Sequence, residues 1–330
     1  MNEAPVASVA DAIRQGDRQA MAKTITLLES RRADHADRGQ AILEQLVPYT
    51  GNAMRLGVTG PPGVGKSTFI ECLGVYLLER AHQVAVLAVD PSSPRSGGSI
   101  LGDKTRMERL SHEKRAYVRP SPSGGSLGGV AARTREAMLV CEAAGYDVVI
   151  IETVGIGQSE FAVRSMVDFF LVLLQPGAGD ELQGIKKGVL ELADTLVVNK
   201  ADGDQEQAAR RAAVDHEQAL GLLRAQSPNW SPRVLTVSSL HGVGIDAVWG
   251  AILDHTAALE ASGERQGRRR EQAREWMWNL VEEGLRQAFR AHPAVASEVA
   301  KLEQEVQSLQ TTPAAAARTL LEAFRRPPDA

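Results

Sequence analysis

Aromatic residues, cysteines and long apolar runs are all scarce in this chain of 330 residues. Aromatic side chains make up 4% of the sequence, which argues against the stacked-base platforms that bind single-stranded nucleic acid. The formal net charge is −4, so the basic excess typical of proteins that bind nucleic acid or anionic membranes is also missing. We therefore expect neither a nucleic-acid partner nor a membrane partner.

The few cysteines and short apolar runs also indicate the cellular compartment of the protein. Cys72 and Cys141 lie in stretches expected to be helical, which favours free thiols in a reducing environment over a disulfide framework. The longest apolar run, Phe169 to Leu174, is too short to cross a bilayer. Residues 1–5 show neither the basic start nor the apolar core of a signal peptide. These features predict a cytoplasmic protein.

One loop carries the clearest chemistry, because residues 60–67 match the phosphate-binding pattern G-x-x-x-x-G-K-[ST]. A short apolar run precedes it and a stretch with helical apolar spacing follows it, so the loop is predicted at a strand-to-helix turn. Glycines there let backbone N–H groups converge on phosphate oxygens. Lys66 is expected to reach the β- and γ-phosphates and to assist catalysis, and Ser67 to ligate Mg²⁺. The predicted nucleotide contacts of this segment are Gly60, Pro61, Pro62, Gly63, Val64, Gly65, Lys66, Ser67 and Thr68.

Short apolar runs alternate with helical stretches from Arg55 to Leu259. Most of the runs lack alternation of period two, as expected for strands covered on both faces of a parallel sheet. The pattern predicts an α/β fold with a doubly wound, mostly parallel sheet, whose ligands bind beyond the carboxyl ends of the strands. The predicted strands are Leu56–Thr59, Val84–Val89, Tyr117–Val118, Val148–Ile151, Phe169–Leu174, Thr195–Val198 and Val234–Val237.

Helical patterns flank this region, so we expect an N-terminal helical arm (1–50), a P-loop domain (51–260) and a C-terminal helical extension (261–330). The run Arg268 to Arg270 is interpreted as a solvated helix face. A later seam of apolar residues spaced four and three apart fits either dimerisation or packing on the chain's own domain, and we favour dimerisation. The seam consists of Val295, Val299, Leu302, Val306 and Leu309.

The tetrapeptide Asn199-Lys200-Ala201-Asp202 matches N-K-x-D and follows a predicted buried strand. A carboxylate at Asp202 can accept hydrogen bonds from N1–H and N2–H₂ of guanine, and adenine lacks both donors. Sites of this kind discriminate by as much as ~10⁴–10⁵. Asn199 is expected at the purine edge and the Lys200 stem over the ring, with Ser238 and Ser239 near the base carbonyl. The pattern predicts GTP as ligand and GDP as its hydrolysis product.

Two acids end predicted strands between these motifs. Asp90 and Glu152 are expected to hold Mg²⁺ and to orient the attacking water, although either acid could simply cap a helix. Gly155 permits close backbone approach to the γ-phosphate. Three glycine-rich segments after strands are predicted to be nucleotide-dependent switches, and a fourth, 123–129, is either a switch or a connector. The three are 91–99, 155–158 and 175–180.

Together these residues resemble the MeaB/ArgK family of G3E-type P-loop GTPases, which includes the methylmalonic aciduria type A proteins. The resemblance is carried by 60–67, by 89–107 (VDPSSPRSGGSILGDKTRM), by 152–160 (ETVGIGQSE) and by 199–202, and it covers nearly the whole chain.

The resemblance implies a homodimeric, slow GTPase that acts as a metallochaperone-type switch on adenosylcobalamin-dependent methylmalonyl-CoA mutase. Such a switch gates cofactor loading and protects the mutase from inactivation. The family pattern makes Asp90, Asp103 and Glu152 a metal-binding and catalytic cluster of acids. It also implies switch residues at Gln158, in the third motif, and at Asp180, where an additional switch begins in which Lys186 is the coupling residue.

Two other functions compete with this interpretation. A kinase that uses ATP would share the P-loop, but Asn199 and Asp202 argue against adenine. A metal-insertion GTPase would need clustered Cys or His ligands, and the 7 histidines are scattered without ligand-like spacing.

Overall fold

The computed structural model describes residues 4–30, 32–89, 107–119, 127–153, 159–177, 187–221 and 226–325. The chain divides into two compact units, Met1–Gln272 and Ala273–Ala330, and helix α13 (Glu264–Ala291) contributes to both. Each unit is considered by itself. Within the described ranges, no helix combines the length and the apolar character needed to span a membrane.

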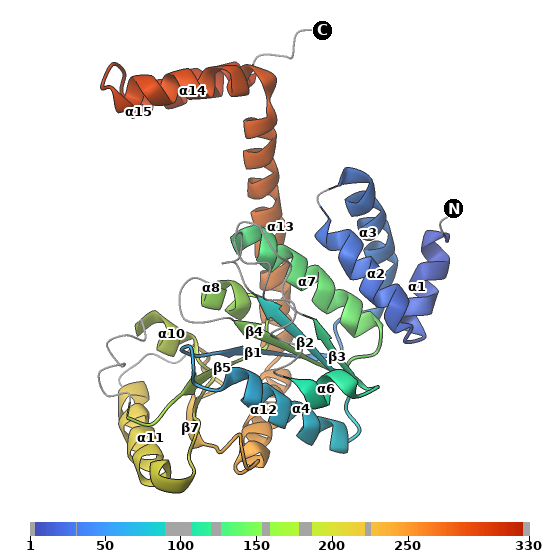
Figure 1. Cartoon of the computed structure of the whole chain (residues 1–330), viewed down its shortest axis with the longest axis vertical. Coiled ribbons are helices and arrows are strands. Elements are labelled where there is room, and N and C mark those ends of the chain that lie inside the picture. The colour runs from blue at the N-terminus through green and yellow to red at the C-terminus, as the bar shows by residue number, and fades with distance from the viewer. Residues whose placement is uncertain are drawn as a thin grey trace. The chain divides into compact units, whose positions relative to one another are not determined.

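The first unit is built on a parallel sheet, which contains seven strands in the part of the chain that is described. The strand order is β3-β2-β4-β1-β5-β6-β7, so the chain starts in the middle and winds outward in both directions (Figure 1). This confirms the predicted fold class, and every predicted strand is present within two residues at each end. The strands are β1 (Met54–Thr59), β2 (Val84–Val89), β3 (Ala116–Arg119), β4 (Val148–Thr153), β5 (Phe169–Leu174), β6 (Thr195–Val198) and β7 (Arg233–Thr236).

Helices cover both faces of the sheet (Figure 1). One face carries α7 (Leu127–Ala143), α8 (Ser159–Arg164), α10 (Lys187–Leu192) and α11 (Glu206–Gly221). The opposite face carries α4 (Lys66–Glu79), α6 (Glu108–His112) and α12 (Ile245–Ala261). Short 3₁₀ turns occupy Val47–Tyr49 and Gly203–Gln205.

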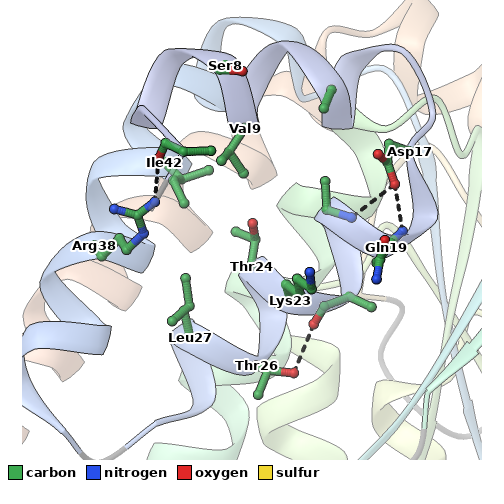
Figure 2. Close-up of a pocket in the computed structure, with 14 residues that line it drawn as sticks. Ser8, Val9, Asp17, Gln19, Lys23, Thr24, Thr26, Leu27, Arg38 and Ile42 are labelled. Carbon is green, nitrogen blue, oxygen red and sulfur yellow. Dashed lines mark hydrogen bonds between the residues drawn. The ribbon is translucent and has the colours of Figure 1, made fainter. Parts of the chain in front are cut away.

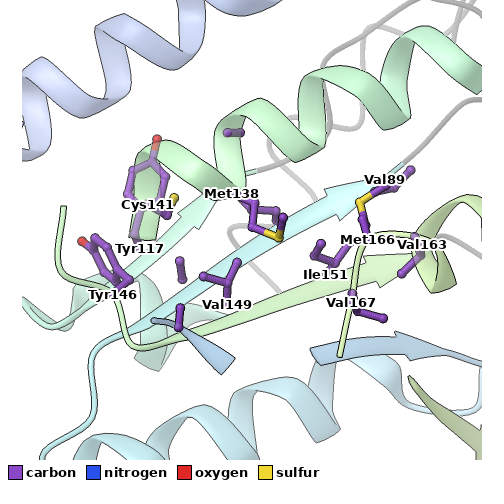
Figure 3. Close-up of a cluster of buried hydrophobic side chains, with 14 of the residues drawn as sticks. Val89, Tyr117, Met138, Cys141, Tyr146, Val149, Ile151, Val163, Met166 and Val167 are labelled. Atoms are coloured by element: carbon purple, nitrogen blue, oxygen red, sulfur yellow. The ribbon is translucent and has the colours of Figure 1, made fainter. Parts of the chain in front are cut away.

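The two-sided cover explains why the strands read as unbroken apolar runs. Alternate residues of β4 enter opposite cores: Val149 and Ile151 face α7, and Val148 and Ile150 face α4. Figure 3 shows Met138 of α7 among the side chains that pack over Val149 and Ile151. Because both faces are buried, every position of β2, β4 and β5 is buried as well.

The N-terminal helices pack on the α7 side of this unit. They are α1 (Val6–Arg14), α2 (Arg18–Glu29) and α3 (Ala33–Leu46). Asp17 caps α2 by accepting hydrogen bonds from the backbone N–H groups of Gln19 and Ala20, at 2.8 and 3.1 Å. A cavity of about 710 Å³ lies among the three helices, and Figure 2 shows Val9, Thr24, Leu27 and Ile42 around it.

The interpretation of Arg268 and Arg269 as a solvated face is wrong. Arg269 Nε donates to Asp168 Oδ1 at 2.7 Å, and Arg268 Nη1 lies 4.0 Å from Asp194 Oδ1. The side chains of Arg268 and Arg269 are only 19% and 15% exposed, whereas Arg270 is exposed. Asp168 and Asp194 directly precede β5 and β6, so the first turns of α13 are bound to the amino edge of the sheet. The arginine run alone does not indicate these contacts, because Asp168 lies 101 residues before Arg269 and Asp194 is likewise far from Arg268 in the sequence.

The second unit contains the rest of α13 with α14 (Pro293–Gln307) and α15 (Pro313–Arg325). Helices α14 and α15 form a hairpin, in which Val295 and Leu302 of the predicted seam are buried. These two residues pack within the chain's own helices, whereas Leu309 at the end of the seam is 91% exposed, and dimerisation through the seam stays a prediction.

Candidate functional site

The P-loop lies at the carboxyl edge of the sheet, between β1 and α4. Gly60 has a φ of +153°, and a Cβ atom there would lie 2.5 Å from the Leu173 carbonyl oxygen. Gly65, with a φ of +95°, forms the N-cap of α4 in the left-handed region. Both positions demand glycine because a side chain would clash or be strained. The loop thus turns tightly and points the N-terminus of α4 at the sheet edge, which is an arrangement suited to phosphate.

The side chains at the phosphate end of this edge are engaged with the loop and with β4. Lys66, only 8% exposed, donates from Nζ to the carbonyl oxygens of Gly60 at 2.7 Å and Pro61 at 3.1 Å. Ser67 Oγ donates to Glu152 Oε1 at 3.2 Å. The carboxylate comes from the second-last residue of β4, so the strand places an acid directly beside the P-loop hydroxyl.

Asn199 ties the N-K-x-D segment to the P-loop. Its side-chain Nδ2 donates to the Val64 carbonyl oxygen at 2.9 Å, and its Oδ1 accepts from Ser239 Oγ at 2.7 Å and from the Ser239 backbone N–H at 3.2 Å. Asn199 is 2% exposed and Ser239 is 6% exposed. The structure therefore brings together three segments that the sequence placed at separate strand ends.

Lys200 and Asp202 lie on the more open side of the same edge. Lys200 adopts a φ of +60° and donates from Nζ to the Gly63 carbonyl oxygen at 2.7 Å. The half-buried Asp202 accepts a hydrogen bond from the buried Ser238 hydroxyl. A carboxylate has about four acceptor positions, so Asp202 keeps acceptor capacity beyond this bond.

Several predicted site residues lie outside the described residues. They are Asp90, Asp103, Gly155, Gln158, Asp180 and Lys186. Of the remaining predicted contacts, Thr68 is exposed on α4 and Pro62 is exposed in the loop. Within the ranges that are described, no group of three or more His, Cys, Asp or Glu side chains is placed to hold a metal ion.

Sequence reasoning missed two features of the edge. Gln175, which follows β5, receives a 3.4 Å hydrogen bond from Lys200 Nζ through its Oε1 atom. The hydroxyls of Thr59 and Thr153 form a hydrogen bond of 2.6 Å between β1 and β4. These residues sit at or next to strand ends, where the register of neighbouring parallel strands would have pointed to them.

Comparison with known proteins is decisive for the family. The model of the family described as "Methylmalonyl Co-A mutase-associated GTPase MeaB" matches residues 21–294. The chain belongs to the MeaB family. The match spans the first unit from α2 onward, with all the strands and both nucleotide motifs, and it reaches the start of α14.

Curated relatives of this MeaB-family chain agree with that assignment. It is 52% identical over 283 residues to GTPase ArgK of Escherichia coli, with 86% of each chain covered. It is 46% identical over 321 residues to the mitochondrial methylmalonic aciduria type A homolog of Mus musculus, covering 94% of this chain and 77% of the relative. The crystal structure of a protein named LAO/AO transport system kinase aligns over 99% of both chains, with 41% identity and a TM-score of 0.78.

Proposed function

We propose that this MeaB-family chain binds GTP at the carboxyl edge of its sheet and hydrolyses it to GDP and phosphate. The contact of Asn199 with both Val64 and Ser239 is the observation that carries the proposal. It joins the base-reading segment to the phosphate loop, so one continuous surface can take a whole nucleotide. The position also follows the rule that open α/β sheets bind ligands beyond the carboxyl ends of their strands.

At the phosphate end, Lys66 already lies inside the loop that would surround the β- and γ-phosphates. We propose that its ammonium group exchanges carbonyl partners for phosphate oxygens when the nucleotide binds. Ser67 and Glu152 offer hydroxyl and carboxylate oxygens, which are the donors that Mg²⁺ prefers, so the residues fit this ion. Bound Mg²⁺ would neutralise charge on the phosphates. Asp90 and Asp103 are proposed to complete the acidic set, and Glu152 or Asp90 to orient the attacking water.

At the base end, Asp202 is proposed to accept from N1–H and N2–H₂ of guanine with the acceptor positions that Ser238 leaves free. Lys200, held by Gly63, would cover the ring with its stem. Ser238 and Ser239 would face the base carbonyl. Gly155 would approach the γ-phosphate through its backbone.

The base-end proposal is tested by Asp202→Asn. Xanthine carries an acceptor where guanine carries N2–H₂, so an Asn amide that donates should favour it. We expect GTP affinity to fall by at least about 100-fold and xanthosine triphosphate affinity to rise, measured by competition for a fluorescent nucleotide. The matched control is Asp204→Asn, an exposed acid just beyond the motif. Unchanged GTP affinity in the Asp202 variant would remove Asp202 from the guanine site.

The biological role is proposed to be that of a metallochaperone-type switch on adenosylcobalamin-dependent methylmalonyl-CoA mutase, gating cofactor loading and protecting the enzyme. The family description and the methylmalonic aciduria relative support this partner. Gln158, Asp180 and Lys186 are proposed as switch residues that respond to the γ-phosphate. A pull-down from a cytoplasmic extract, with GDP and with a non-hydrolysable GTP analogue, tests both the mutase partner and the nucleotide-dependent switch. Equal recovery of the mutase in the two nucleotide states would contradict a switch.

A homodimer is the proposed assembly, supported by an apolar stripe on α13 in the second unit. Met277, Trp278, Val281 and Leu285 recur at helical spacing and are 42–59% exposed. Exposed apolar stripes of this kind mark interaction sites, and a second copy can cover both stripes at once. In this proposal, 1–50 is a helical arm, 51–260 the GTPase domain and 261–330 the dimerisation extension.

A second candidate function is phosphotransfer from ATP, which is favoured by the kinase name of the structural relative. Competition between ATP and a fluorescent guanine nucleotide distinguishes the kinase function from the GTPase function. The GTPase proposal expects ATP to displace a fluorescent guanine nucleotide only at concentrations at least about 1,000-fold above GTP. Equal competition by ATP would favour the kinase.

A further inference from the structure

Two buried threonines join the ends of the central strands. Thr59 is the last residue of β1 and Thr153 is the last residue of β4. Their hydroxyl oxygens lie 2.6 Å apart, and both side chains are 0% exposed. One hydroxyl donates to the other, so each polar group has its partner within the core.

The position of this bond in the sheet sets it apart from an ordinary cross-strand pair. The backbone register between β1 and β4 runs from Met54–Val148 to Val58–Glu152. On the outer sides, Thr59 still pairs with Val172 of β5, and Thr153 with Val89 of β2. In the described part of the chain, the hydroxyl bond is therefore the final link between β1 and β4 before one strand enters the P-loop.

The two threonines also flank the groups that must meet during hydrolysis. Thr59 directly precedes Gly60, and Thr153 directly follows Glu152, whose carboxylate lies 3.2 Å from Ser67 Oγ. Successive side chains of a strand point to opposite faces, so Glu152 faces α4 and Thr153 faces away from it. A shift of the end of β4 at Thr153 therefore moves the Glu152 carboxylate relative to the P-loop.

We propose that Thr59 and Thr153 are a positioning pair, whose hydroxyl bond holds Glu152 at the distance from the P-loop that GTP hydrolysis requires. The proposal rests on the GTPase function proposed above. It gives the pair a role in turnover and none in nucleotide affinity, because the two buried hydroxyls bond to each other.

Valine substitutions test it, because valine keeps the shape of threonine and removes the hydroxyl. Thr59→Val and Thr153→Val each leave one buried hydroxyl without its partner, so each should lower Tm and kcat. The double variant removes both polar groups and should regain the wild-type Tm. We expect its kcat to stay about 10- to 100-fold below wild type, since small displacements of catalytic groups have effects of that size. Its Kd for GDP should stay within about twofold of wild type.

Thr24→Val is the matched control. Thr24 is 0% exposed and its hydroxyl has no hydrogen-bond partner in the described structure, where it lies by the cavity among the N-terminal helices (Figure 2). The same chemical change there should leave kcat unaltered. Serine at Thr59 or Thr153 keeps the hydroxyl and should rescue kcat to within about threefold of wild type.

Three results would overturn the proposal. The first is a double valine variant with wild-type kcat, which would make the bond merely structural. The second is a loss of GDP affinity as large as the loss of kcat. The third is a serine variant whose kcat is as low as that of its valine counterpart. If the valine variants do not fold, a serine variant with kcat more than about 10-fold below wild type overturns the proposal instead. These results differ from a failure of the proposed GTPase function, in which the wild-type protein itself would release no phosphate from GTP.

Discussion

Replacing Asp168 tests how firmly α13 is bound to the amino edge of the sheet. The Asp168 carboxylate accepts hydrogen bonds from Arg269 Nη2 at 2.5 Å, from Arg265 Nη2 at 3.4 Å and from the backbone N–H of Arg55 at 3.1 Å. Its side chain is 5% exposed, and those of Arg269 and Arg265 are 15% and 14% exposed. Asp168→Ala therefore leaves two nearly buried guanidinium groups without their shared counter-charge.

Breaking a buried ion pair from one side costs about 3–5 kcal/mol of unfolding free energy. We expect Asp168→Ala to lose that much in urea denaturation of the full chain followed by far-ultraviolet circular dichroism. Asp254→Ala is the matched control, because Asp254 pairs with Arg233 at 2.7 Å where both side chains are about half exposed, at 59% and 46%. Exposed pairs contribute about 0–1 kcal/mol. A loss of under about 1 kcal/mol for Asp168→Ala would refute the inference that this carboxylate anchors α13.

The same contact predicts a dependence on pH. Burial alone would raise the pKa of Asp168, but the hydrogen bond and charge of Arg269, with the charges of Arg265 and Arg55, hold that pKa below its ordinary value. A carboxyl group with a lowered folded pKa stabilises the fold above the unfolded pKa, about 3.9 for Asp. That stability is lost as pH falls below about 4 and through the folded pKa. Asp168→Asn should flatten this acid loss, and an unchanged slope below about pH 4 would contradict it.

Three further variants test the site and the assembly. Lys66→Ala should weaken GTP binding by at least about 100-fold, because the proposed phosphate site loses its ammonium group. Lys23→Ala on α2 should bind GTP normally in the same fluorescence titration. Glu152→Ala should bind GTP but release phosphate at least about 10-fold more slowly; a wild-type rate would exclude Glu152 from catalysis. Leu285→Glu should convert the proposed dimer to a monomer in light scattering at micromolar concentration, while Leu321→Glu on α15, which is 50% exposed, should not. Dimers in both variants would contradict a dimer contact through the α13 stripe.

Local chemistry explains why much of the fold was predictable. The apolar runs of β2, β5 and β6 matched the strands residue for residue, because strands buried on both faces need continuous apolar sequence. The cap of α2 at Asp17 is equally local, because an N-cap side chain finds its partners within three residues. The P-loop pattern likewise encodes its turn through glycines such as Gly60 and Gly65.

Contacts between distant segments were beyond such reasoning. A run of three arginines looks the same in sequence whether it is solvated or paired, and only the sheet brings Asp168 to Arg269. The apolar seam of α14 fits a coiled coil and a hairpin equally well, and only the structure shows α15 beside α14 with Val295 and Leu302 buried. Thr59 and Thr153 carry no motif at all until β1 and β4 are in register.

The sequence by itself determined the P-loop pattern, the N-K-x-D pattern and the alternation of strands and helices, because each depends on spacing within a few residues. Only the tertiary structure decided that Asn199 reaches Val64, that Glu152 lies beside Ser67 and that Arg269 of α13 pairs with Asp168. Those contacts depend on strand order and register, which place residues about 100 positions apart within a few ångströms.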